Sequence, residues 1–382
     1  MTNTPKSKCL RLKPDGLASI QAALASASQN LATAGLMSGY LQLVDAGKLT
    51  LDTNMREVFG PLDAAASQVI TCLEDGRPVT EKNNAPVTLG QMLNQTSGFG
   101  MEFGDKVPAW KKSADKGSGF VNSCKIDNLI YTPLCFAPGT SYEYGNSAEW
   151  LGLILPTLVG MSTEEYFQAN VLRPLGMANT SFYPDHAEWI DRLLPLRFRV
   201  EDGYEELKDQ LPLLTLPRRR EEIEYPVAGG GIYSCSSDYI KVLCHLLQHR
   251  LSLSGRATRP KTTLLSDTSL NSLFTGTLPD AALPGIVEMF EHYFGPEEKF
   301  VLGEANWSTG MAVYAPNDGR RRAGFGRLAG SVGWGGAAGT QYWIDEAAGI
   351  AVVFTTQVLP GSGPDTKEFK DMMERAIYGA LE

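Results

Sequence analysis

Apolar residues recur at helical spacing through the first two thirds of the chain. This periodicity predicts helices that begin at serine or asparagine caps and end at glycine or proline. The expected helical segments are residues 17–47, 87–97, 147–160, 164–175 and 236–251. Asn146 or Ser147 is expected to cap the third helix, with Glu149 completing a capping box, and Ser236 or Ser237 is expected to cap the last helix.

The pattern changes after Trp307. Short runs there alternate apolar and polar residues between Gly-rich turns, which predicts strands. These runs are TGMAVYAP, GSVGWGGAAGTQYWID and GIAVVFTTQ, and DTKEFKDMMERAIYGAL follows them as an amphipathic helix. We expect residues 305–382 to form an antiparallel sheet with the C-terminal helix packed on it. The middle of the chain, with polar loops over residues 101–143, is expected to form a helical lobe. The predicted fold class is therefore α+β.

Composition describes an ordinary globular protein. The chain has 382 residues, 43% of them apolar and 20% charged, and can form one large domain or two lobes that share a cleft. The net charge of −9 argues against nucleic-acid binding. Two arginine clusters, at residues 218–220 and 320–322, are interpreted as solvated loops.

The chain shows no signal for a membrane or for secretion. The N-terminal residues MTNTPKSKCLRLKPDG lack the apolar core of a signal peptide. The longest apolar run, from Trp150 to Met161, is too short to span a bilayer and contains Pro156. The six cysteines have no Cys-x-x-Cys spacing, which favours reduced thiols and a cytoplasmic location.

The segment VGWGGAAGTQYWID (332–345) is the first candidate for chemistry. Gly335 and Gly336 lack side chains, so the backbone there can approach another molecule closely, and the following strand can present an N–H group. An oxyanion hole for acyl transfer needs such a donor where negative charge develops. A Gly-rich turn before a core strand fits the same residues, and the segment alone leaves both interpretations open.

Tyr144 is the second candidate. It follows the turn Pro138-Gly139 and precedes Gly145, Asn146 and a long apolar helix, which places its phenol at the mouth of that helix. A tyrosine that transfers protons needs a pKa well below its reference value of about 10, which requires nearby cations. A half-buried tyrosine beside a helix cap explains the same pattern, and no lysine lies close in sequence.

Three other patterns favour structural roles or exclude a class of enzyme. Gly229-Gly230-Gly231 is not followed by the Lys-Ser/Thr of a phosphate loop, which favours a tight turn. His245 and His249 have the spacing of two zinc ligands, but no glutamate lies between them and no third ligand is evident, so no metal site is expected. The sequence Gly-x-Ser-x-Gly does not occur, which argues against an α/β-hydrolase.

Six segments, in order along the chain, resemble a known family. They are LQLVDAGKLTLD, VTLGQMLNQTSGF, FAPGTSYEYGNSAEWLG, RPLGMANTSF, AGGGIYSCSSDYIKVL and GWGGAAGTQYWID. They resemble the serine β-lactamase and penicillin-binding-protein superfamily, in particular its esterase and transesterase branch with the fungal lovastatin-type acyltransferases. The resemblance covers roughly residues 36–380. It implies a β-lactamase/transpeptidase-like fold, with an antiparallel sheet flanked by helices, in a single domain over 1–382. The implied sheet lobe is 1–50 with 226–382, and the helical lobe is 51–225.

The resemblance also implies roles for individual residues. Tyr144 matches the catalytic tyrosine of the family and Asn146 the asparagine of its Tyr-x-Asn motif. Trp334-Gly335-Gly336 matches the third motif, where β-lactamases have Lys-Thr-Gly. These three residues, Ala337 and Asn146 are expected to bind substrate or complete the oxyanion hole. Tryptophan in place of the motif lysine points away from β-lactams, whose carboxylate the lysine helps to hold, and towards esters or thioesters.

The nucleophile of the family is not found in this sequence. In the family it is the serine of Ser-x-x-Lys, where one helical turn places the lysine beside the serine. Aligned on LQLVDAGKL, those positions are Asn30 and Thr33. One Ser-x-x-Lys does occur, Ser113 to Lys116, but it lies in a polar loop beyond the Thr96-Ser97-Gly98 segment, whereas the family motif precedes that segment. The nucleophile therefore stays unassigned: it has been lost, or the sequence lacks the segment that carries it. We expect an exposed sheet edge, poor solubility and no measurable esterase activity for the chain as printed.

The expected function is acyl transfer or ester hydrolysis through an acyl-enzyme, with Tyr144 shuttling the proton of the alcohol. The implied setting is the tailoring of a secondary metabolite such as a polyketide. The substrate is expected to be a small-molecule ester, thioester or alcohol, with an acyl carrier domain as one candidate donor and no cofactor or metal. Two alternatives stay open: an inactive protein that keeps the same cleft for binding, and an isomerase or lyase that depends on Tyr144.

Overall fold

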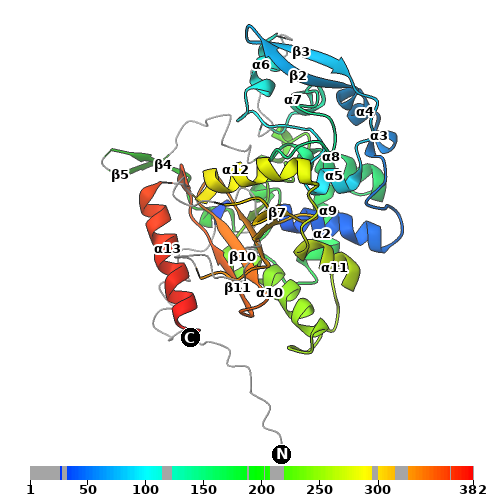
Figure 1. Ribbon diagram of the computed structural model, residues 1–382. Coiled ribbons are helices and arrows are strands. Elements are labelled where there is room, and N and C mark those ends of the chain that lie inside the picture. Colours follow the sequence, from blue (N-terminus) through cyan, green and yellow to red (C-terminus); the bar gives the residue numbers. More distant parts are fainter. Residues whose placement is uncertain are drawn as a thin grey trace, which may run out of the picture.

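A five-stranded antiparallel sheet lies at the centre of the molecule, in the order β11-β10-β9-β8-β7, with helices on both faces (Figure 1). The computed structural model describes residues 26–27, 32–113, 123–186, 189–201, 203–206, 219–294, 300–314, 326–361 and 363–381. The sheet consists of β7 (Ala305–Trp307), β8 (Ala312–Tyr314), β9 (Ser331–Gly335), β10 (Gln341–Asp345) and β11 (Ile350–Phe354). The antiparallel sheet predicted for the last third of the chain is thereby confirmed.

Two neighbouring residues of β10 show which helices cover each face of the sheet. The ring of Tyr342 packs 5.3 Å from that of Tyr239 on α10 (Ser236–Leu253). The indole N–H of Trp343 donates to the hydroxyl of Tyr378 on α13 (Pro364–Gly379), 3.2 Å away. Because successive side chains of a strand point to opposite faces, α10 and α13 cover opposite faces of the sheet. The predicted packing of the C-terminal helix on this sheet is also confirmed.

Helices from the middle of the chain form the second part of the fold (Figure 1). They are α3 (Met55–Val58), α4 (Gly60–Ala66), α5 (Leu89–Leu93), α6 (Lys106–Ser113), α7 (Asp127–Ile130), α8 (Ser147–Val159) and α9 (Thr163–Phe167). The long apolar run predicts α8 correctly, and Trp150, Leu151 and Ile154 within it are fully buried. The helix α2 (Ala32–Asp45) packs beside α8, where the Tyr40 hydroxyl donates to the Leu151 carbonyl (2.7 Å).

The remaining elements are shorter or lie at the periphery. The other helices are α11 (Asp267–Phe274), α12 (Leu283–Phe294), a π-helical turn (Gln168–Leu172) and the 3-10 turns Pro184–His186, Ile190–Arg192, Arg220–Glu222 and Asp280–Ala282. Three small sheets pair β1 (Ser26–Ala27) with β6 (Tyr233–Ser234), β2 (Gln68–Glu74) with β3 (Arg77–Lys82), and β12 (Val358–Leu359) with β4 (Arg197–Val200) and β5 (Gly203–Glu206). Within the described ranges, none of the helices combines the length and the apolar composition needed to cross a membrane.

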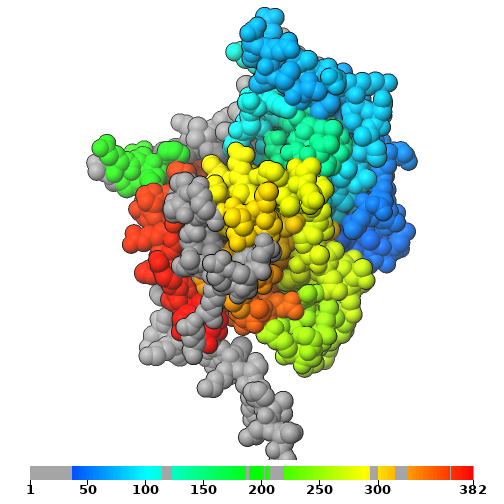
Figure 2. Space-filling view, in the orientation of Figure 1, coloured from blue at the N-terminus to red at the C-terminus, as the bar shows by residue number. Residues whose placement is uncertain are grey.

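Several local predictions are wrong. The stretch 101–143 contains α6 and α7 as well as loops. The helix expected over residues 164–175 changes after Phe167 into the π-helical turn, and the N-cap of α10 is Cys235. The hairpin β2–β3, which projects at the top of Figure 2, was not predicted. Its turn, Asp75-Gly76, has positive φ at both residues (49° and 74°), and Asp-Gly is a recognisable signal for such a turn.

The strand β11 lies at one edge of the central sheet as the described residues form it. Within the part of the chain that the structure describes, β11 pairs only with β10. Its residues, Ile350 to Phe354, are all partly exposed although four of the five are strongly apolar or aromatic. Among the described residues β11 is an edge strand; the exposed edge and the poor solubility expected from the sequence stay predictions.

Candidate active site

Three aromatic rings meet between the central sheet and the loop that leads into α8. Tyr144 lies on that loop, Trp307 ends β7 and Trp334 lies in β9. The ring centroids of Tyr144 and Trp334 are 5.2 Å apart, those of Tyr144 and Trp307 5.9 Å, and those of the two tryptophans 4.7 Å. We call these three residues the aromatic cluster. It joins distant parts of the sequence, and Trp307 belongs to no motif that could have revealed it.

Tyr144 is followed by a close crossing of two backbone segments. A Cβ added to Gly145 would lie 1.6 Å from the carbonyl oxygen of Phe99, so no other residue fits there without moving the backbone. Gly98 has a φ of +97°, and a Cβ on it would lie 2.3 Å from the carbonyl oxygen of Phe136. Trp307 is fixed as well, because its indole N–H donates to the Leu93 carbonyl (3.2 Å). The aromatic cluster therefore rests on rigid supports.

Asn146 is buried at the start of α8, with 3% of its surface exposed. Its side chain makes no capping hydrogen bond, and the expected capping box with Glu149 is wrong. In the described part of the chain, its Oδ1 has no hydrogen-bond partner. A buried acceptor without a partner destabilises a protein by about 1–3 kcal/mol, and a donor group on a bound substrate would satisfy it. Asn146 adjoins a buried pair of hydroxyls, Ser97 and Ser147, whose oxygens are 2.7 Å apart.

The predicted oxyanion segment forms the end of β9 and the turn after it. Trp334 is buried, and Gly335 pairs with Gln341 of β10. The N–H of Gly336 donates to the Thr340 carbonyl (2.7 Å), so it is engaged within the turn. Ala337 is exposed and its carbonyl accepts from the Gly361 N–H (2.7 Å). The Ala337 N–H makes no hydrogen bond to any described residue, which leaves it as the candidate donor of this segment.

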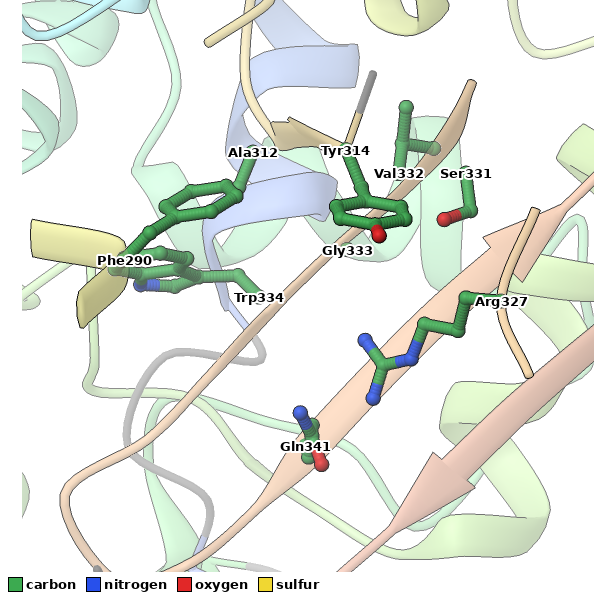
Figure 3. Close-up of a pocket in the computed structure, with 9 residues that line it drawn as sticks. All are labelled: Phe290, Ala312, Tyr314, Arg327, Ser331, Val332, Gly333, Trp334 and Gln341. Atoms are coloured by element: carbon green, nitrogen blue, oxygen red, sulfur yellow. The ribbon is translucent and has the colours of Figure 1, made fainter. Parts of the chain in front are cut away.

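A small cavity of about 30 Å³ lies beside Trp334, with room for about two waters (Figure 3). Its lining consists of Phe290, Ala312, Tyr314, Arg327, Ser331, Val332, Gly333, Trp334 and Gln341. In Figure 3, Phe290 and Trp334 lie side by side at one end, and Arg327 and Gln341 lie at the other. Tyr144 and Asn146 do not line this cavity. The structure thus brings Tyr144 and Trp334 into ring contact, with the cavity adjoining Trp334.

The polar end of the cavity is held by an ion pair. Arg327 makes two hydrogen bonds to the Glu374 carboxylate on α13, at 3.0 and 2.9 Å, and stacks 4.1 Å over the Trp343 ring. Both members of the pair are buried. A bidentate pair of this kind is geometrically specific and holds the guanidinium in place. Arg327 therefore joins α13 to the sheet and closes one wall of the cavity.

Glu149, in the first turn of α8, is a buried carboxyl that the sequence motifs do not explain. It is 4% exposed, and its Oε1 lies where a Cβ on Gly229 would be only 2.3 Å away. Burial raises its pKa to about 7; hydrogen bonds to backbone N–H groups, including that of Gly229, oppose the rise, and the nearby Glu102 carboxylate adds to it. Glu102 is itself ion-paired with Lys111 (2.7 Å). The absence of a side chain at Gly229 thus provides room for this carboxyl.

Glu149→Gln is expected to make folding stability less dependent on pH. Glutamate in an unfolded chain has a pKa of about 4.3, whereas burial raises that of Glu149 to about 7. As pH rises through this window the unfolded chain loses its proton first, so the folded protein loses stability. The difference corresponds to about 4 kcal/mol. We therefore expect Glu149→Gln to resemble the parent at pH 4 and to be more stable by that order at pH 8, measured by urea unfolding.

The matched control for that experiment is Glu165→Gln. Hydrogen bonds from the Ser162 side chain and backbone lower the pKa of Glu165, so its contribution to stability is present at high pH and lost as pH falls. Its replacement should not raise stability at pH 8. If the stability of the parent and of Glu149→Gln depended equally on pH, this would contradict the raised pKa of Glu149.

The histidine pair has a structural role. The Nε2 of His249 lies 2.9 Å from Asp267, and the Nε2 of His245 accepts from the Leu264 N–H (3.1 Å). Among the described residues, no group of three or more His, Cys, Asp or Glu side chains is placed to hold a metal ion.

No residue of the described chain stands out as the nucleophile. Ser113 is exposed at the end of α6, and its hydroxyl donates to the Trp110 carbonyl of the same helix (2.9 Å). Lys116, its motif partner, lies outside the described residues, as does Asn30. Thr33 lies in the first turn of α2.

Proteins of similar sequence carry names of acyl-transferring and ester-hydrolysing enzymes. The chain is 26% identical to "Acyltransferase calJ" of Penicillium decumbens over 90% of its own length and 78% of that protein. It is 24% identical to "Lovastatin esterase" of Penicillium rubens over 93% of its length and 84% of that protein.

Solved structures show the same fold. Unliganded simvastatin synthase (LovD) from Aspergillus terreus superposes with a TM-score of 0.76 at 20% identity, covering 94% of this chain and 85% of that one. A penicillin-binding protein from Bacillus halodurans gives a TM-score of 0.59 at 18% identity, with coverages of 94% and 86%. The family model described as Beta-lactamase matches residues 33–376. Because this match spans most of the chain and agrees with the fold, the protein belongs to the beta-lactamase family.

Proposed function

We propose that the aromatic cluster belongs to a site for acyl transfer between a small-molecule ester or thioester and an alcohol. The observation that carries the proposal is the 5.2 Å contact between the rings of Tyr144 and Trp334, two residues from different motifs that only the fold brings together. The family and the acyltransferase and esterase names of the relatives support it.

In the proposed reaction, the serine of the family motif, which aligns with Asn30 and is absent from the printed sequence, would attack the acyl carbon, and the bond to the donor oxygen or sulfur would break as the donor leaves with a proton. The acceptor alcohol then attacks the acyl-enzyme, loses its proton through Tyr144, and the serine regains a proton. The Ala337 N–H would stabilise the oxyanion, and Asn146 would bind a polar group of the substrate. Trp334 supplies an aromatic wall in place of a lysine, which suits a neutral ester better than a carboxylate.

The substrate we propose is a secondary metabolite such as a polyketide, with an acyl group delivered as a thioester, for example on an acyl carrier domain. We assign the sheet lobe to 1–50 and 226–382 and the helical lobe to 51–225. The described cysteines form no disulfide with one another, and Cys72 and Cys244 are exposed, which suits a reducing compartment such as the cytoplasm.

Tyr144→Phe tests the assignment of the proton-transfer group. In a chain that carries Asn30→Ser with Thr33→Lys, we expect it to lower the rate of acyl transfer from a p-nitrophenyl ester to an alcohol by about 10²–10⁴-fold, as for loss of a general acid–base group. Product formation is measured by mass spectrometry.

Tyr142→Phe is the matched control. Tyr142 is buried two residues away, and its hydroxyl finds no hydrogen-bond partner in the described ranges, so removal of that hydroxyl should leave the rate unchanged. Equal losses in the two variants would assign the effect to packing and contradict a proton-transfer role for Tyr144.

A further inference from the structure

Gln95, which follows the short helix α5 by two residues, has an unusual backbone. Its φ is +64°, in the left-handed region that non-glycine residues rarely occupy, and 1% of its surface is exposed. The backbone is supported from the α5 side, because Thr88 and Gln91 form a capping box and the Thr96 N–H donates to the Asn94 side chain (3.3 Å). A strained conformation on a rigid support is a feature that proteins concentrate at functional sites.

The two oxygens of Gln95 hold both neighbours of Tyr144. Its backbone carbonyl accepts from the Glu143 N–H (3.3 Å), and its side-chain Oε1 accepts from the Gly145 N–H (3.1 Å). In an extended segment, the backbone N–H groups of residues i and i+2 point to the same side. The N–H groups of Glu143 and Gly145 can therefore bind one partner. Gln95 therefore binds the loop through hydrogen bonds to the residues immediately before and after Tyr144.

The amide nitrogen of Gln95 shows that this residue is not optimised for stability. Its Nε2 is buried and has no hydrogen-bond partner among the residues that the structure describes. A buried donor without a partner destabilises the fold, and the left-handed backbone adds to that cost. The left-handed backbone and the unpaired donor therefore both occur at the residue that binds the two neighbours of Tyr144.

We propose that Gln95 is the positioning residue that fixes the Tyr144 phenol against Trp334 and Trp307 for proton transfer. The inference rests on the proposed function of Tyr144. Without the Oε1 acceptor, the buried Gly145 N–H loses its partner and the tyrosine ring is free to leave the aromatic cluster. Because catalysis is sensitive to displacements of about 1 Å, loss of this grip is expected to lower kcat by about 10²-fold and leave KM unchanged.

The test uses 3-fluorotyrosine at position 144 and ¹⁹F NMR on the chain as printed, so it does not depend on activity. The main variant is Gln95→Asn, because asparagine tolerates the left-handed backbone but its side chain is one carbon too short to reach Gly145. We expect the fluorine resonance to shift and broaden. Gln95→Glu, measured at pH 5 where a buried carboxyl is protonated, keeps the acceptor and should restore the parent resonance.

Asp75→Gly is the control for backbone strain. Asp75 also has a positive φ (49°), but it lies in the exposed β2–β3 turn, so its replacement should leave the resonance unchanged. A parent-like resonance in Gln95→Asn, or a failure of Gln95→Glu to restore it, would overturn the positioning role. If Gln95→Asn does not fold, the resonance of Gln95→Glu alone decides whether Gln95 positions Tyr144.

A kinetic arm separates this inference from the function on which it rests. In the chain with Asn30→Ser and Thr33→Lys, Gln95→Asn should lower kcat at constant KM, and Gln95→Glu should restore it. In one outcome, Gln95→Asn shifts the resonance while Tyr144→Phe leaves acyl transfer unchanged. That combination would overturn the catalytic role of Tyr144 but not the positioning of the loop by Gln95. An unshifted resonance in Gln95→Asn overturns the positioning role of Gln95, whether or not Tyr144 transfers protons.

Discussion

A chain that carries Asn30→Ser with Thr33→Lys is expected to react covalently with a fluorophosphonate probe, whereas the chain as printed is expected to show no labelling and no turnover of p-nitrophenyl esters. In the Ser-x-x-Lys motif of the family, the lysine amine takes the proton of the serine hydroxyl. A general base of this kind contributes about 10²–10⁴-fold to the rate. Intact-protein mass spectrometry detects the adduct, and p-nitrophenol release measures turnover.

The course of α2 supports this pair of substitutions. Met37 packs against Gly310, where an added Cβ would lie 2.6 Å from its side chain. Gly310 lies between β7 and β8, three residues after Trp307 of the aromatic cluster. Met37 therefore lies against the connection that follows Trp307, and Thr33 lies one turn before Met37 on the same helix.

Each single substitution, Asn30→Ser or Thr33→Lys, should remain unlabelled, because either lacks one half of the proton transfer. Ser113→Ala in the double variant should not change labelling, because Ser113 is an exposed residue whose hydroxyl bonds to its own helix. If the chain as printed is a soluble monomer that hydrolyses p-nitrophenyl esters, the expected inactivity is refuted. Ser113→Ala would then be the first variant to examine. An unlabelled double variant that still binds esters would favour a binding protein.

Gly145→Ala is expected to destabilise the protein by about 3 kcal/mol or more. The added methyl would lie 1.6 Å from the Phe99 carbonyl oxygen, and a backbone atom cannot move aside as the end of a side chain can. Forced overpacking typically costs about 1–3 kcal/mol, and values above that come from a short set of causes that includes backbone clashes. Urea unfolding followed by circular dichroism measures the change.

Gly60→Ala is the control for the intrinsic effect of the substitution. A Cβ on Gly60, at the start of α4, meets no atom within 4 Å, so alanine should be neutral or slightly stabilising there. A loss below about 1 kcal/mol for Gly145→Ala would show that the two backbone segments do not cross as described.

The sequence determined those features that a local pattern expresses. The alternation after Trp307 identified the strands β8 to β11, and the unbroken apolar run identified α8, because an element buried between two layers shows its burial in its own residues. The six ordered segments also indicated the family, and with it the proposal that Tyr144 and Trp334, whose rings are in contact, belong to one site. Some turns marked by glycine could be placed for the same reason, since only certain residues allow the backbone they need, although the Asp75-Gly76 turn was missed.

Only the tertiary structure decided which residues meet and how. Trp307 joins the aromatic cluster without a motif, Gly336 turns its N–H to Thr340, and Asn146 leaves its oxygen unpaired where a cap was expected. Gln95 looks in the sequence like part of a short helix, yet its side chain bonds a residue 50 positions away. Periodicity along a chain reports whether a residue is buried. The partner that buries it depends on how the sheet and the helices pack, and the chemistry of the site depends on that partner.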